Sequence, residues 1–288
     1  MRDEECHFRK RATTPLHVRN RVLAHGTLFS ELVQWLDDHL RLPLVDVPER
    51  DAETLEEIER AAEACREYWD LKVDAPIQNM TRVLERAGVV VAAFSGISTK
   101  LDAFSWHGRR PMVIRSTDKG STSRARWDLA HECGHLVLHA GVVTGEAERE
   151  GEANRFASAF LLPRRGFARE FPRSARLDWT ALFRLKQRWG ASLQAIVRRA
   201  YDLRLLSAVQ YRRAHIHISK RGWRTREPQE PEGEALELVT TALSVAQEKL
   251  GKAPSSIARE LGWRGAVFEA VAGVPMPEGE VIPLGAAR

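Results

Sequence analysis

Apolar residues recur at helical spacing through the first part of the chain. This spacing predicts a helix over 18–40 and a second helix over 51–69, which begins with acidic residues. The apolar faces of these two helices are formed by Val22, Leu28, Leu32 and Leu36, and by Leu55, Ile58, Ala62 and Cys65. A third helix is expected to open at 74–76 and to end near Ala87, where Gly88 closes it.

The pattern then changes to short β-rich runs. Strands are predicted over 89–94, 101–106 and 111–115, and residues 107–110 are expected to join the last two strands as a hairpin. Helical spacing returns at 121–122, where Ser121 or Thr122 can cap a helix that runs through His139. A further helix is predicted from near Glu146 to Leu162, where Pro163 stops it.

The chain after Pro163 is predicted to be mostly helical. Amphipathic stretches cover 179–189 and 193–206, whereas 211–219 fits either a strand or a helix. Residues 225–234, rich in Pro and Glu, form the clearest predicted linker, and two or three short helices follow it. The predicted class is α+β, with an N-terminal helical extension (1–50), a central domain (51–170), a helical continuation (171–228) and a small helical C-terminal domain (234–288).

Composition narrows the class of protein. In 288 residues, 43% are hydrophobic and 29% are charged, as in an ordinary globular protein. We expect a cytoplasmic protein without a membrane partner, because the N-terminus is charged and no unbroken apolar run is long enough to span a bilayer. The 3 cysteines are too few for a disulfide framework. The net charge of +5 is compatible with nucleic-acid binding, but a solvated Arg-rich surface explains it more simply.

One motif carries metal chemistry: His131-Glu132-Cys133-Gly134-His135. Histidines four residues apart lie on one face of a helix, so both imidazoles can reach one Zn²⁺ ion. Glu132 lies at the edge of that face and can act on water as a general base without binding the metal. The alternative is a buried helix whose two histidines are satisfied by protein neighbours, but the apolar flanks and the preceding cap favour the metal site.

A catalytic zinc site needs a third protein ligand, and we predict Glu150. Asn154 follows one turn later and can hold a zinc-binding histidine by its far nitrogen. Glu146 and Glu148 are interpreted as a solvated helix start, which is also the alternative for Glu150. His139 is interpreted as a helix-end histidine and Cys133 as a core residue. The Cys6 thiol, on an N-terminal arm, is a candidate regulatory group that could block the metal.

Residues 124–139 and 150–163 resemble the ImmA/IrrE zinc metallo-endopeptidases, and 103–106 with 110–114 resemble the sheet of that family. The resemblance implies a zincin-like minimal domain with a small three-stranded sheet and one Zn²⁺ per chain. It places the ligands at His131, His135 and Glu150, and the base at Glu132. Cys133 stands where the family often has leucine. A second electrophile is usual in such enzymes, and the candidates here are Tyr201, Tyr211, His107 and Arg110.

The resemblance also implies a substrate. Family members typically cut a helix-turn-helix repressor and thereby activate stress, mobile-element or defence genes. Residues 1–50 hold about one helix, too few for a helix-turn-helix domain of their own, so we expect the repressor to be a separate protein. Residues 256–263 have helix-turn-helix spacing, but the apolar stretch 265–271 favours a packed hairpin over DNA binding.

Three further readings stay open from the sequence. The chain could be a non-catalytic module that sequesters a repressor, or a DNA-binding regulator, in which case its affinity for DNA would fall steeply with salt. Single-stranded DNA could also act as an activator without being the substrate.

Overall fold

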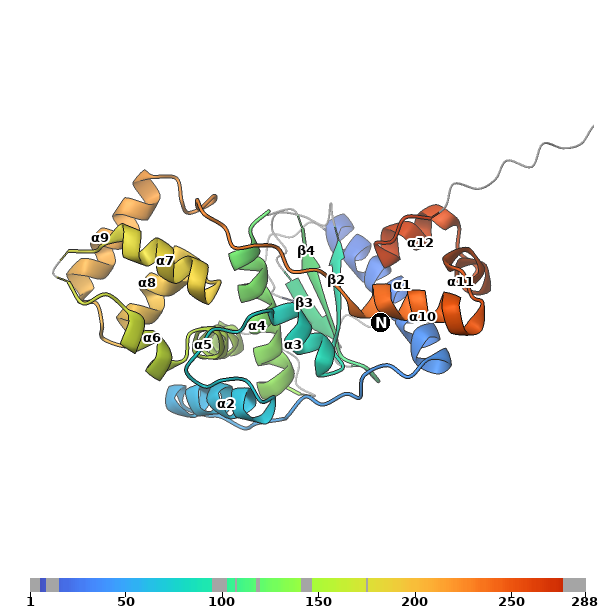
Figure 1. The fold of residues 1–288 in the computed structure, drawn as a ribbon, viewed down its shortest axis with the longest axis horizontal. Helices are drawn as coiled ribbons and strands as arrows, with labels where there is room; N and C mark the ends of the chain where they lie inside the picture. The colour runs from blue at the N-terminus through green and yellow to red at the C-terminus, as the bar shows by residue number, and fades with distance from the viewer. Residues whose placement is uncertain are drawn as a thin grey trace, which may run out of the picture.

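The computed structural model describes residues 6–8, 16–94, 103–106, 108–117, 120–140, 147–174 and 176–276. The predicted α+β class is confirmed (Figure 1). The strands are β1 (Cys6–Phe8), β2 (Val90–Phe94), β3 (Ala103–Trp106) and β4 (Met112–Ser116). The helices of the first half are α1 (Leu16–His39), α2 (Leu55–Tyr68), α3 (Met80–Arg86), α4 (Thr122–Leu138) and α5 (Ala147–Leu161). The later helices are α6 (Arg164–Glu170), α7 (Trp179–Trp189), α8 (Leu193–Asp202), α9 (Ala208–Lys220), α10 (Leu238–Leu250), α11 (Pro254–Glu260) and α12 (Gly265–Ala272).

The sheet has four strands in the order β1-β3-β4-β2. β3 is antiparallel to β1 and to β4, and β2 is parallel to β4. The three predicted strands are present, and the predicted hairpin pairs Trp106 with Met112. β1 adds a fourth strand at the β3 edge, in a stretch that is too short and too polar to predict as a strand from the sequence.

Alternate residues of the central strands face opposite sides of the sheet, and both sides are buried. Val91 and Val113 pack into the core formed by the helices α2 to α9. Val90, Ala92, Met112 and Ile114 pack into a second core against α1, α10, α11 and α12. The sheet is therefore the middle layer of the molecule, with α4 on one face and α1 together with the C-terminal helices on the other (Figure 1). The predicted domain boundaries remain predictions.

Residues 211–219, for which the sequence left strand and helix open, lie within the helix α9. The third helix begins later than predicted, at Met80 rather than at 74–76, and Asn79 caps it by accepting a hydrogen bond from the Arg82 amide. Ala75 precedes Pro76, which disfavours a helical conformation at that residue. The carbonyls of this segment are instead bound by two buried guanidinium groups: Arg66 donates to Lys72 and Ala75, and Arg126 donates to Ile77 and Gln78.

The predicted linker is not a solvated spacer. Residues 225–237, which we call the strap, run in an extended path from α9 to α10. In Figure 1 this segment passes α4 and then the sheet before it reaches α10. Its glutamates accept hydrogen bonds from backbone amides at the starts of three helices: Glu227 from Leu193 at α8, Glu230 from Ser123 at α4, and Glu234 from Met80 and Thr81 at α3. Carboxylates are favourable at these positions because the amide ends of helices carry partial positive charge.

The side chain of Lys186 lies fully buried on α7 and fixes the strap further. Its ammonium nitrogen lies 2.8 Å from Glu227 Oε2 and 2.6 Å from Glu230 Oε1. Glu85 of α3 supplies the reciprocal contact at the far end, because its carboxylate accepts from the amides of Glu237 and Leu238. A run rich in Pro and Glu is usually solvated, so the sequence pattern predicts a solvated linker. The pattern cannot reveal partners that lie far from the strap along the chain.

Replacing Glu227 with alanine is expected to lower the free energy of unfolding by about 3 kcal/mol, because it removes one carboxylate from a buried ammonium group and leaves the α8 amides without their acceptor. Denaturant titration of the purified chain measures this change. Glu232→Ala, at an exposed position of the same strap, is the matched control and should change stability by less than about 0.5 kcal/mol. Equal effects of the two substitutions would contradict a structural role for Glu227.

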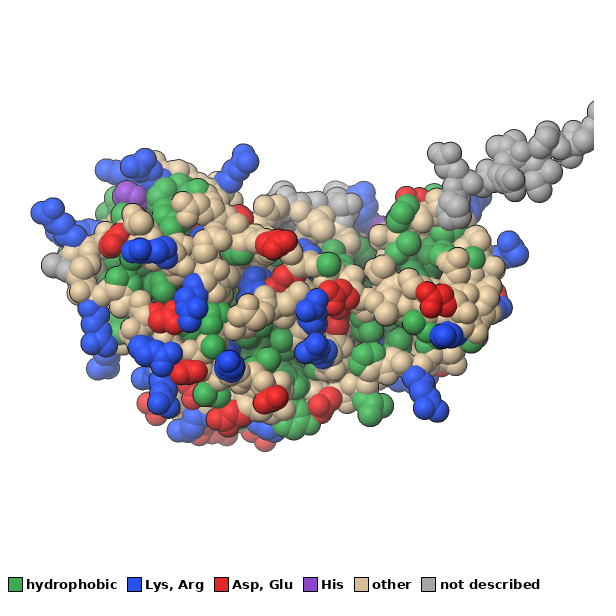
Figure 2. Space-filling view, in the orientation of Figure 1, with side chains coloured by type: hydrophobic (Ala, Val, Ile, Leu, Met, Phe, Trp, Pro, Cys, Tyr) green, Lys and Arg blue, Asp and Glu red, His purple; other side chains and the backbone are tan. Residues whose placement is uncertain are grey.

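Charges are mixed on the face shown in Figure 2. Lys and Arg side chains are most frequent over the half formed by α6 to α9, and acidic side chains are interspersed with them. Within the described residues, no helix has the length and apolar character that a membrane span requires.

Candidate metal centre

The helix α4 carries both histidines of the motif into the interior. Of the two predicted candidates, Ser121 caps the helix by accepting a hydrogen bond from the Arg124 amide. Beyond the first turn, apolar residues on both sides of the motif bury it, among them Leu129, Ala130, Leu136 and Val137. The one-turn spacing brings His131 Nε2 and His135 Nε2 to 3.1 Å from each other. Both ring nitrogens therefore converge on one point.

The helix α5 brings Glu150 to the same point. Its Oε2 lies 3.5 Å from His131 Nε2, and its Oε1 lies 3.4 Å from His135 Nε2. One ligand atom from each of the three residues lies within 4.8 Å of the others. Gly134 permits this approach of α4 and α5, because a β-carbon there would lie only 3.2 Å from atoms of Ala153 and Phe156. The glycine in the motif thus has a packing role that brings the third ligand into reach.

Asn154 sets the orientation of His131. Its Nδ2 donates to the Glu150 carbonyl oxygen at 2.7 Å, which turns Oδ1 toward His131. Oδ1 lies 3.1 Å from His131 Nδ1, and an amide oxygen can only accept a hydrogen bond. His131 therefore carries its proton on Nδ1 and directs the lone pair of Nε2 toward His135 and Glu150. This is the contact expected for Asn154, and its role at a metal ligand stays a prediction.

The electrostatics of the three converging groups suit a divalent cation. Burial lowers the pKa of His135 to about 4, although contact with Glu150 acts in the opposite direction, so the imidazole is neutral near pH 7. Burial raises the pKa of Glu150, but its contacts with His131 and His135 outweigh this effect and hold the pKa well below its usual range. Neutral imidazoles and an ionised carboxylate are the protonation states in which these side chains bind metal.

Glu132 lies beside the three converging groups but is held by a different partner. Its carboxylate is buried and accepts a hydrogen bond of 2.6 Å from Ser105 Oγ on β3. Burial raises the pKa of Glu132 to about 7, while His131 and the Ser105 hydroxyl act against this shift. A carboxyl group with a pKa near the working pH can both accept and return a proton. Ser105 could not be predicted as a partner of Glu132, because the contact depends on how the sheet meets α4.

The other predicted site residues are placed differently. Arg110 donates to the carbonyls of Pro43 and Gly88 and pairs with Asp37. Its guanidinium therefore binds the loop between β3 and β4 to neighbouring segments. Tyr201 and Tyr211 stack on each other, with ring centroids 4.4 Å apart. The role of second electrophile therefore stays unassigned among these candidates. His107 lies outside the described residues.

The cysteines fall into two groups. Cys133 is buried in the core, as predicted, next to Cys65, and burial raises the pKa of both thiols, that of Cys65 to about 12. The backbone of Cys6 lies in β1, opposite Trp106 of β3, while its side chain lies outside the described part of the chain. The blocking role suggested for its thiol remains a prediction.

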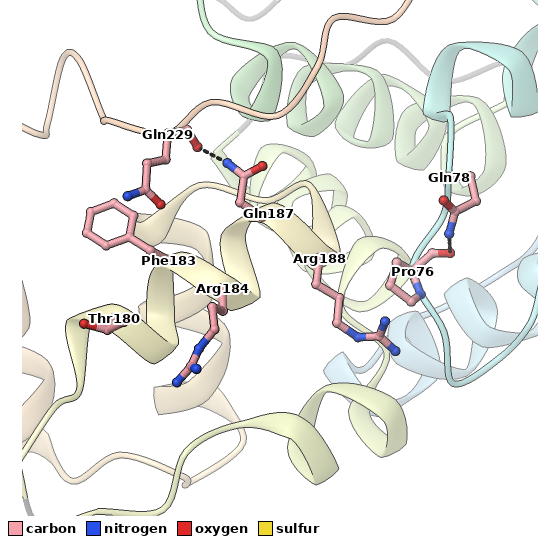
Figure 3. Close-up of a pocket in the computed structure, with 8 residues that line it drawn as sticks. All are labelled: Pro76, Gln78, Thr180, Phe183, Arg184, Gln187, Arg188 and Gln229. Carbon is pink, nitrogen blue, oxygen red and sulfur yellow. Dashed lines mark hydrogen bonds between the residues drawn. The ribbon is translucent and has the colours of Figure 1, made fainter.

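A cavity of about 650 Å³ opens elsewhere, between α7, the strap and the segment before α3. Its lining residues are Pro76, Gln78, Thr180, Phe183, Arg184, Gln187, Arg188 and Gln229 (Figure 3). In Figure 3 the Gln187 amide faces Gln229, whose carbonyl accepts a hydrogen bond from it. None of the predicted metal-site residues lines this cavity.

An α+β domain in which two histidines of one helix and a glutamate of the next converge beside a buried carboxyl group is a metallopeptidase-type domain. Residues 84–201 match the family model of the IrrE N-terminal-like domain, Peptidase_M78. The match contains α4, α5 and all of the converging residues, and it confirms the resemblance seen in the sequence. No curated protein matches the chain.

Proposed function

We propose that the chain is a zinc-dependent, site-specific endopeptidase that cleaves a helix-turn-helix transcriptional repressor and thereby activates genes of stress response, defence or mobile elements. The observation that carries the peptidase proposal is the convergence of His131, His135 and Glu150 beside the buried Glu132. The nature of the substrate rests on the family resemblance.

The donor set fits zinc. Two imidazole nitrogens and one carboxylate oxygen form the ligand set of many catalytic zinc sites, and three protein ligands leave a coordination position for water or substrate. His131, His135 and Glu150 would hold the ion. When bound, zinc supplies a Lewis acid that polarises the scissile carbonyl and makes water more acidic.

Glu132 is the group that moves protons in this proposal. It takes a proton from the attacking water and returns it to the leaving amide nitrogen. The Ser105 hydroxyl holds one carboxylate oxygen in place, which leaves the second oxygen for the proton. Because Ser105 lies on β3, the position of the base is fixed by the sheet as well as by α4.

The same strand is the natural place for the substrate backbone. An extended segment that pairs with the edge of a sheet gains main-chain hydrogen bonds irrespective of its sequence. Among β2, β3 and β4, the strand that contacts Glu132 is β3, and its outer edge pairs with β1, with His7 opposite Ser105. We therefore place the substrate beside β3, where it would compete with β1.

Removal of residues 1–8 is expected to raise the cleavage rate at low substrate concentration by about three- to tenfold, because apparent affinity scales with the fraction of molecules whose site is open. The comparison is with a chain lacking only residues 1–4, which keeps Cys6–Phe8, and zinc content is measured in both. Equal rates in the two chains would show that β1 does not compete with substrate.

The direct test mixes the zinc-loaded chain with the helix-turn-helix protein encoded beside it and follows the products by intact mass. One defined cut, absent with Glu132→Gln, supports a site-specific peptidase. Tight binding without a cut supports the sequestering module instead. Parallel reactions with and without single-stranded DNA test the activator.

A further inference from the structure

Two side chains behind the converging groups form a hydrogen-bonded chain that ends at His135. His135 Nδ1 lies 2.9 Å from His139 Nδ1, and His139 Nε2 lies 2.8 Å from Glu152 Oε2. His139 is almost fully buried at the end of α4, and Glu152 reaches it from the first half of α5. The sequence suggested only a helix-end position for His139, because its partner lies on another helix.

The partners determine which nitrogen of each ring carries the proton. The Glu152 carboxylate oxygen is an acceptor, so His139 Nε2 donates to it. With a single proton on each ring, His139 Nδ1 is then the acceptor of its other hydrogen bond. The donor of that bond is His135 Nδ1, and the lone pair of His135 Nε2 is left facing His131 and Glu150.

We infer that His139 and Glu152 are positioning residues that fix the tautomer and the ring orientation of the metal ligand His135. This inference rests on the proposed zinc-binding function. Asn154 does the same for His131, so both orienting contacts lead to side chains of α5, directly for His131 and through His139 for His135. The helix α5 therefore supplies the third ligand, the outer partner of His131 and the carboxylate that orients His139.

The arrangement explains why a histidine is buried at position 139. An apolar side chain could fill the same space but would leave the Nδ1–H group of His135 buried without an acceptor. The proton could then move to Nε2, where it would oppose metal binding. Outer partners of this kind commonly change metal affinity by about 10- to 100-fold.

The test measures zinc affinity, by competition with a chromophoric chelator, in variants of the full chain. His139→Leu keeps bulk but removes the acceptor, and we expect zinc to bind about 10- to 100-fold more weakly. His139→Asn places an amide oxygen near the position of Nδ1 and should restore affinity to within about threefold of the native chain. A purely structural role would not distinguish these variants by their hydrogen-bond acceptor.

Glu152 provides a second, partly exposed position, whose replacement should leave folding intact. Glu152→Ala should weaken zinc binding by about tenfold, and Glu152→Gln, which keeps an acceptor oxygen, by much less. Glu148→Ala removes an exposed carboxylate one turn earlier on α5 and should change nothing.

The outcomes separate the inference from the proposed function. Zinc binding by the native chain together with unchanged affinity in His139→Leu and Glu152→Ala would overturn the inference and leave the function standing. A native chain that does not bind zinc would overturn both. If His139→Leu does not fold, the two Glu152 variants decide.

Discussion

Glu132→Gln is expected to leave zinc binding intact and to reduce peptide cleavage by at least about 10²- to 10⁴-fold, the range by which general acid–base groups accelerate reactions. The amide has nearly the shape of the carboxylate, and its oxygen can still accept the hydrogen bond from Ser105 Oγ. It cannot take a proton from water. The substitution therefore removes the proton transfer while it keeps the packing around a fully buried side chain.

The measurement is the initial rate of product formation, with the zinc content of the same samples determined in parallel. Ser105→Ala is an informative companion, because it removes the hydroxyl that holds Glu132 but leaves the carboxylate, and its effect should be much smaller. A Glu132→Gln chain that cleaves at the native rate would rule out Glu132 as the base.

The second large effect is expected at Glu150. Its replacement by alanine removes one of three ligands, and we expect zinc affinity to fall by on the order of a hundredfold or more, given total zinc-binding free energies on the order of 10 kcal/mol in protein sites. The side chain is partly exposed and its helix is otherwise packed by apolar residues, so α5 should still form. Cleavage should be lost together with zinc.

Thermal unfolding with and without added zinc measures the binding independently of activity. A ligand that binds only the native state raises the unfolding temperature, so the native chain should show a zinc-dependent increase that Glu150→Ala lacks. Glu148→Ala, at an exposed position of the same helix, should retain the increase. A full zinc-dependent increase in Glu150→Ala would show that the metal uses another third ligand.

Local signals predicted the elements that depend on local chemistry. The amphipathic stretch 179–189 coincides with α7, and Ser121 caps α4, because periodicity and capping act within a few residues. The spacing of the motif was sufficient to predict the two converging histidines. Glu150 and Asn154 could be predicted from the sequence because they lie one helical turn apart.

Contacts between distant segments account for what the sequence could not predict. The late start of α3 depends on the guanidinium groups of Arg66 and Arg126, which bind carbonyls that a helix would otherwise use. Ser105 and His139 acquire their roles only when β3 and α5 reach α4. The path of the strap depends on a lysine, Lys186, that is buried about forty residues earlier in the chain.

The strap also determines what a break in the chain would do. Glu232 and Gly233 are exposed, yet the chain is fastened on one side of them by Glu227 and Glu230 and on the other by Glu234. A protease that nicked the molecule there would release no free end longer than a few residues. The two fragments would stay associated through the helices to which they are bound, and the C-terminal helices would keep their place on the sheet as a non-covalent subunit.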